Sequence, residues 1–216
     1  MVFNNKHNED APRFPGVITF AIIFGWFGAM LYAGDTGLLR TWNGIGPLSA
    51  LQTCIVAPIA IFFAAYLLLS PFRRYVLGLD PATLAAVQII RILGSAHFIS
   101  WGYGLMAGSF AFAVGGGNFI IMLIALHTTY RTAHRLPGWR LSMYALTLLG
   151  LAEFAMTIAL ANLGFFTKPL PFDPPVAAGG YASFLDLPIS IYPSFLIPLF
   201  CVFHFATLMR LAKGAR

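Results

Sequence analysis

Charged residues are scarce in this 216-residue chain. Only 9% of its residues are charged, against about 25% in an ordinary soluble domain, and 59% are hydrophobic. The sequence holds no Ser-His-Asp arrangement and no clustered metal-ligand motif, so we expect no hydrolase site of the soluble type and, apart from the haem alternative below, no metal site. The two cysteines, Cys54 and Cys201, both lie in long apolar runs. We expect buried packing thiols and no disulfide.

Uncharged runs recur at the length of a membrane crossing. A spanning helix needs roughly 20 apolar residues, and the uncharged runs 14–34 and 41–72 hold 21 and 32 residues. The 50 residues of 81–130 carry a single charge, Arg91, which suits two spans. We therefore predict an all-α polytopic transmembrane bundle, one domain over 1–216, with six helices at about 15–34, 47–70, 82–106, 109–130, 141–164 and 188–209.

Local signals place two of the helix ends. Asp80 is a suitable N-cap, and Pro81 suits the first helical position because its missing N–H would have no partner there. Gly104, Gly108 and Ser109 favour a tight hairpin between the third and fourth spans.

Basic residues orient the bundle. With both termini cytoplasmic, ten of the thirteen basic residues fall inside, two (Arg40 and Lys168) fall outside, and Arg91 lies within a span. The net charge of +6 then indicates contact with anionic lipid headgroups and no nucleic acid. The N-terminal segment, with Glu9 and Asp10, is unlike a signal peptide. We predict a multi-pass protein of the plasma (inner) membrane, with other membrane subunits or a second copy as candidate partners.

The longest connection, 165–187, is rich in proline and glycine and is expected outside the cytoplasm. Two interpretations stay open: a proline-stiffened loop, or a lid over an entrance.

Polar residues inside the bilayer are the candidate site, since each is costly unless paired or solvated. Gln88, Arg91 and Ser95 share one helical face, whereas His97 is about 120° from Arg91 and is expected to face another neighbour. Glu153 shares a face with Gly150 and Thr157. The remaining candidates are Asn118, His127, and a last-helix stripe that comprises Ser190, Ser194, Cys201 and His204.

Depth groups these residues further. At 1.5 Å per residue, Glu153 lies near the membrane middle, and Arg91 and His204 lie in its inner half. We therefore predict that Arg91 faces the bundle interior within reach of Glu153, His204 or both. Asn118 and His127 fall on opposite sides of a regular helix, unless the glycine triplet 115–117 breaks that helix.

The second half of the chain resembles a family of uncharacterised bacterial multi-pass membrane proteins. The resemblance covers roughly 85–210 and rests on Arg91-Ile-Leu-Gly94, Trp101, Gly104, the run 112–118, and a closing Pro193-x4-Pro198-x5-His204 segment. In that pattern an arginine precedes a glycine-rich turn that ends in aspartate. This chain departs from it with Asn118 and Glu153 in place of two aspartates. The resemblance implies these functional positions: Arg91, Gly115, Gly117, Asn118, Glu153 and His204.

Three classes of function remain open. The first is proton-linked transport of a small solute or ion through a polar cavity around Arg91, Asn118, Glu153, His204 and Gln88. The second is a structural or assembly subunit of a larger membrane complex. The third is a b-type haem protein with His127 and His204 as axial ligands; on the other two interpretations no cofactor is expected.

Overall fold

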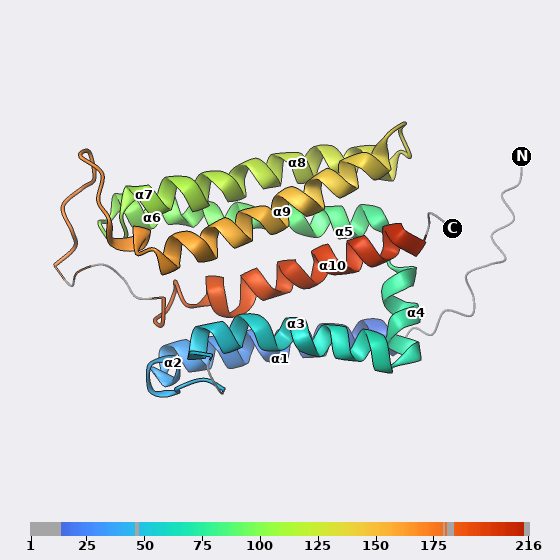
Figure 1. The fold of residues 1–216 in the computed structure, drawn as a ribbon, viewed down its shortest axis with the longest axis horizontal. Coiled ribbons are helices and arrows are strands. Elements are labelled where there is room, and N and C mark those ends of the chain that lie inside the picture. Colours follow the sequence, from blue (N-terminus) through green and yellow to red (C-terminus); the bar gives the residue numbers. More distant parts are fainter. Residues whose placement is uncertain (1–13, 46–47, 179, 181–183, 214–216) are drawn as a thin grey trace, which may run out of the picture.

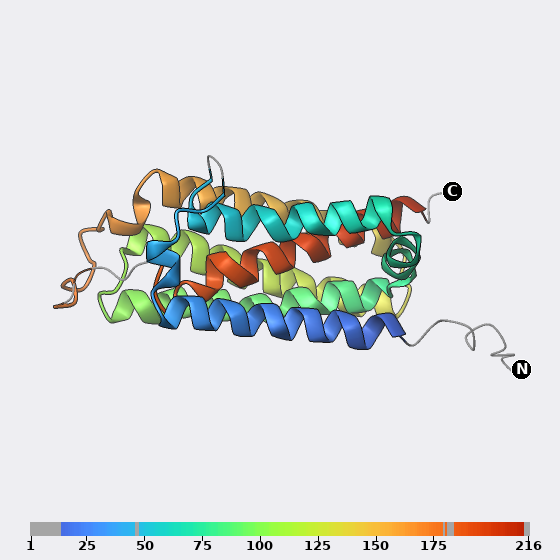
Figure 2. The ribbon, with the colours of Figure 1, turned by 90° about the horizontal axis from the view of Figure 1, so that it is seen from below.

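Six long helices run side by side in an elongated bundle (Figure 1; Figure 2). The computed structural model describes residues 14–45, 48–178, 180 and 184–213. Apart from one isolated bridge between Ile45 and Leu48, the described residues pair no strands. Six helices are long and apolar enough to cross a membrane: Gly16–Asp35, Ala50–Leu68, Pro81–Gly102, Gly108–Ala133, Trp139–Asn162 and Tyr192–Lys213.

The predicted all-α fold, with six helices of a length and apolarity that suit a membrane, is confirmed, and the shifted boundaries have local causes. The second span begins at Ala50 and not at 47, because Ser49 and Gln52 form a capping box there. The sixth span continues past 209 to Lys213, since basic residues are favoured in the last turn of a helix. The third begins as predicted: the Asp80 carboxylate accepts the Thr83 N–H at 2.9 Å, and Pro81 follows.

Several of the long helices consist of consecutive segments with different helix geometry. The segments labelled in Figure 1 are α1 (Phe14–Asp35), α2 (Leu38–Thr41), α3 (Ala50–Leu68), α4 (Ser70–Gly78), α5 (Pro81–Val87), α6 (Ala96–Gly102), α7 (Gly108–Phe110), α8 (Gly116–Ala133), α9 (Trp139–Asn162) and α10 (Ile197–Lys213). Between and beside them lie the 3₁₀ segments η1 (Gln88–Ser95) and η3 (Phe165–Thr167), and the π segments η2 (Ala111–Gly115) and η4 (Tyr192–Leu196).

Helix α4 was not predicted. It lies across the end of the bundle at which α5 begins and α10 ends (Figure 1), and it carries Arg73 and Arg74 on its exposed side. We call this end the inner end and the opposite end the outer end. The first residue of α1 and the last of α10 both lie at the inner end, as an even number of spans requires.

The predicted hairpin between the third and fourth spans is present. Gly104 has φ +66°, a backbone conformation that residues with a Cβ rarely adopt. Its carbonyl also accepts the Ala177 N–H, so the turn is held to the loop that covers it.

Helix α1 lies at the edge of the bundle. Its main attachment is aromatic: the Trp26 and Phe27 rings lie 4.8 and 5.0 Å from that of Phe195. Most of its other large side chains, such as Phe20 and Phe24, are exposed. This span is therefore held by much less protein contact than the others.

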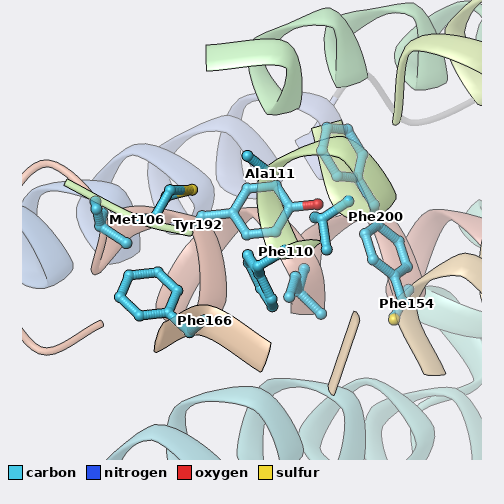
Figure 3. Packing of buried hydrophobic residues seen from close by; sticks show 11 residues of the cluster. Met106, Phe110, Ala111, Phe154, Phe166, Tyr192 and Phe200 are labelled. Carbon is cyan, nitrogen blue, oxygen red and sulfur yellow. The ribbon is translucent and has the colours of Figure 1, made fainter. Parts of the chain in front are cut away.

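A polar layer lies between the two larger apolar clusters of the described residues. The outer cluster gathers Phe110, Phe166 and Tyr192, whose ring lies across the middle of the view in Figure 3. The inner cluster includes Leu84 and Leu146. On each of the last four spans one polar residue of this layer lies between members of the two clusters: Arg91, Asn118, Glu153 and His204.

The segment 165–187 is fastened to the outer end. The Asp173 carboxylate accepts N–H groups from Trp101, Gly108 and Leu170 at 2.8–3.0 Å. Desolvation acts to raise the pKa of Asp173, but these three donors outweigh it and hold the pKa below its ordinary value. Asp186 pairs with Arg40; this hydrogen-bonded pairing lowers the pKa of Asp186 and raises that of Arg40.

Candidate functional site

Arg91 is the centre of the polar layer. Its side chain is buried (1% exposed) and forms an ion pair with Glu153. Its Nε donates to Asn118 Oδ1 at 3.0 Å, its Nη1 donates to the Gly150 carbonyl at 3.3 Å, and the guanidinium lies 4.0 Å from the Phe154 ring centroid. The predicted contact between Arg91 and Glu153 is therefore present. All three guanidinium nitrogens and one face of its plane therefore contact protein.

Glu153 is held by more than the arginine. One oxygen pairs with Arg91, and the other accepts from Asn118 Nδ2 and from Thr157 Oγ1, each at 3.0 Å. Glu153 is 6% exposed, so these partners replace water. A buried ion pair tolerates burial only when its remaining hydrogen-bonding capacity is used in this way.

Asn118 joins the ion pair to the last span. Its Nδ2 lies within hydrogen-bond distance of Glu153, of the Val114 carbonyl (2.9 Å) and of the Tyr192 hydroxyl (2.5 Å). An amide has only two N–H groups, so one of them is shared between two acceptors. Through Asn118, a single network connects η1, α8, α9 and η4.

His97 has different neighbours from Arg91, as predicted: its ring packs against Phe110 and Tyr192, whereas the guanidinium contacts Asn118, Gly150, Glu153 and Phe154. The predicted angle between them is not the reason. The residues between them are in η1, where each residue turns the chain by about 120° and not 100°. Six residues on, His97 therefore returns to nearly the same side of the span, but closer to the outer end, where it meets other side chains. Its ring packs edge-on against Tyr192, with centroids 4.6 Å apart, so it borders the network.

Tyr192 was missed for a related reason. It belongs to η4, a π segment, whose i to i+5 bonding adds about one residue to the turn. A regular helix places Tyr192 off the stripe that ends at His204, and the extra residue rotates it inward. The stripe itself is confirmed: Ser190, Ser194, Cys201 and His204 are all buried.

The glycines of the site serve close packing. A Cβ on Gly94 would lie 2.5 Å from Asn118 Cγ, and one on Gly117 would lie 2.9 Å from Glu153 Cγ. A Cβ on Gly115 would lie 3.3 Å from the Phe98 ring. The prediction of a glycine turn here is wrong: the triplet is helical throughout, with π geometry ending at Gly115. These residues lack side chains because neighbouring spans come within contact distance.

His204 borders the network, and Gln88 is buried on the same segment, η1, as Arg91. A Cβ on Gly150 would collide with the His204 ring and lie 3.0 Å from Arg91 Nη1, so the imidazole borders the guanidinium. Within the described structure, His204 Nε2 and both amide atoms of Gln88 are buried without a hydrogen-bond partner. Buried polar atoms without a partner are uncommon in proteins, so these atoms are candidates to bond a ligand, a water or a proton.

The two histidines of the haem alternative are not brought together. His204 is buried within the polar layer, whereas His127 is on the exposed side of α8. A regular helix predicts this, because Asn118 and His127 fall on opposite sides and Asn118 is the buried one. Among the described residues no group of three or more His, Cys, Asp or Glu side chains is placed to hold a metal ion.

Sequence reasoning located the charged members of the site through their cost in a bilayer. It missed Tyr192 and the roles of Phe154 and Gly150, which are ordinary residue types in a span and become visible only through helix geometry. No protein family, curated protein or solved structure matches this chain.

Proposed function

We propose that this protein moves a small solute or ion across a plasma (bacterial inner) membrane in linkage with protons, with the Arg91–Glu153 pair as the group that responds. One observation carries the proposal. The segments η1, η2 and η4 depart from regular α-helix in three different spans: η1 supplies Arg91 of the buried ion pair, and η2 and η4 contact Asn118, which bonds both of its members.

Irregular helical segments inside a membrane are often part of a functional site. Local 3₁₀ and π segments recur at functional sites, and transporters build their binding sites near the membrane middle where helices are discontinuous. Here such segments supply Arg91 and Tyr192 and precede Asn118. Protonation of Glu153 would remove the charge opposite Arg91 and free it for an anionic or polar solute.

The direction of the bundle follows from charge. We place both termini in the cytoplasm, so that ten of thirteen basic residues lie on that side. The inner end is then the cytoplasmic one, and segment 165–187 is extracytoplasmic.

A cavity of about 610 Å³ at the outer end suits an entrance. Phe166, Phe184 and Leu185, from the 165–187 segment, line it together with Arg40 and Trp42. Its size is in the range of small-molecule sites. On this interpretation the segment is a lid, and the Arg40–Asp186 pair holds it in place.

A structural or assembly role is the second candidate. It is favoured by the exposure of α1, which leaves a large apolar surface for another membrane subunit or a second copy. In that case Arg91 and Glu153 would only lock the spans together.

Reconstitution separates the two candidates. Purified protein in vesicles that contain a pH-sensitive dye would be given gradients of amino acids, monocarboxylates, sugars and monovalent cations, one class at a time. We expect one class to change the internal pH with wild-type protein and not with His204→Gln. If no class moves protons while the protein remains folded, transport is rejected and the structural role is adopted.

A further inference from the structure

A small basic pocket lies at the inner end, apart from the polar layer. It encloses about 80 Å³, and four parts of the chain contribute to it: the start of α5, the α8–α9 connection, the start of α9 and the end of α10. We call it the inner arginine pocket. Its lining residues are Pro81, Arg135, Trp139, Arg140, Arg210 and Leu211.

The pocket is preorganised by contacts to its arginines. The Arg135 and Arg140 guanidinium groups lie 4.7 and 5.5 Å from the Trp139 ring centroid, within the range of cation–π attraction. Arg210 Nε donates to the Leu79 carbonyl at 3.2 Å, which fixes that side chain and leaves its terminal nitrogens for another acceptor.

Two of these arginines, Arg135 and Arg210, are in no ion pair with another described residue. The two ion pairs within the described residues use Arg40 and Arg91, and neither involves Arg135 or Arg210. Arg135 is also held in an unfavourable backbone conformation. It has φ 51°, the one positive φ among described non-glycine residues, and such strain tends to persist where it serves a function.

We propose that the inner arginine pocket binds the phosphate of an anionic phospholipid headgroup. The planar guanidinium fork matches the oxygens of a phosphate group, and basic pockets at the membrane surface between spans are suited to such headgroups. The ends of the spans lie at headgroup level, and the buried Pro81 and Leu211 give the pocket an apolar floor for the glycerol. The proposal is independent of transport.

Native mass spectrometry of the detergent-purified protein tests it with three probes. Phosphatidylglycerol, phosphatidylcholine with the same acyl chains, and inorganic phosphate would each be titrated. We expect one phosphatidylglycerol molecule to bind more tightly than phosphatidylcholine, and inorganic phosphate not to displace it. Equal binding of the two lipids, or full displacement by inorganic phosphate, would overturn the proposal.

Variants localise the site. The double variant Arg135→Gly/Arg210→Gln should bind phosphatidylglycerol at least about tenfold more weakly. The matched control Arg73→Gln/Arg74→Gln removes the same charge from the same end, outside the pocket, and should change affinity by less than about twofold. The single variant Arg135→Gly relieves the strained backbone, so it should fold at least as well as wild type and still lose affinity. Equal losses in the pocket and control variants would reduce the site to general surface charge and refute the proposal.

Discussion

Asn118 stands between two opposite charges, and an amide can serve both. Its oxygen accepts from Arg91 while its nitrogen donates to Glu153. An aspartate, which the family resemblance leads one to expect here, would only accept when ionised and would place a second negative charge beside Glu153. Asparagine at position 118 therefore leaves Glu153 as the carboxylate that pairs with Arg91.

Two substitutions in the layer should have different consequences. Glu153→Gln keeps the shape of the side chain but leaves Arg91 buried and unpaired, which costs about 3–5 kcal/mol. His204→Gln leaves no ion unpaired. We expect the first variant to lose thermal stability in detergent, and the second to stay folded while losing the pH dependence of transport.

The outcomes separate the proposed functions. Size-exclusion profiles and melting curves measure folding, and the vesicle assay measures proton movement. If both variants fold, assemble and function like wild type, then Arg91, Glu153 and His204 do not form a working site.

Gly150 should not tolerate even a methyl group. A Cβ there meets the His204 ring and Arg91 Nη1, so Gly150→Ala should cost about 1–3 kcal/mol of stability through overpacking. Gly28→Ala is the matched control, since Gly28 is also helical and its Cβ would meet nothing within 4 Å. That change should be neutral or stabilising by up to about 1 kcal/mol. Equal melting temperatures for the two variants would contradict the close packing of Gly150 against His204 and Arg91.

At the scale of elements, the sequence predicts where helices occur better than how they wind. Apolar length places the six spans, and Asp80-Pro81 places one start to the residue, because both signals are local. The 3₁₀ and π segments are set by packing between spans, which the residue pattern does not encode. That is why the angular count holds for Glu153 and Thr157, which lie in regular helix, and gives the wrong angle for His97, although the expected difference in neighbours is present.

Asp173 should control the attachment of the 165–187 segment. Asp173→Asn removes the charge that accepts three N–H groups, so chymotrypsin should cut after the exposed Phe172 faster than in wild type. Asp186→Asn, which loosens the other end of the segment, is a useful comparison. If Asp173→Asn leaves the cleavage rate unchanged, the carboxylate does not hold the segment.

The same carboxylate gives this attachment a pH dependence. Because the pKa of Asp173 lies below its ordinary value of 3.8, its stabilising effect is complete above that value and is lost as pH falls through the lowered pKa. Wild-type cleavage rates, measured with an acid-tolerant protease, should be flat from neutral pH to about pH 5 and should rise only below about 3.8. A rise already near neutral pH would contradict this assignment.

For the whole molecule, the orientation is the prediction most open to test. A periplasmic phosphatase fused after Arg216 should be inactive, and the same reporter inserted near Ala178 in the 165–187 segment should be active. The expectation rests on the asymmetry of basic residues, which acts during insertion. Activity of the C-terminal fusion would invert the bundle and move the inner arginine pocket to the other surface.

The distance in sequence between Arg91 and its partners also has a consequence for biosynthesis. Asn118 follows Arg91 by 27 residues, and Glu153 follows it by 62. At about 5–20 residues per second, the ribosome needs roughly 3–12 s to supply the counter-ion. During that interval the nascent hairpin of the third and fourth spans has the Asn118 carboxamide as its available acceptor for the guanidinium. We therefore expect that the Asn118 carboxamide, once synthesised, accepts a hydrogen bond from Arg91 until Glu153 is made.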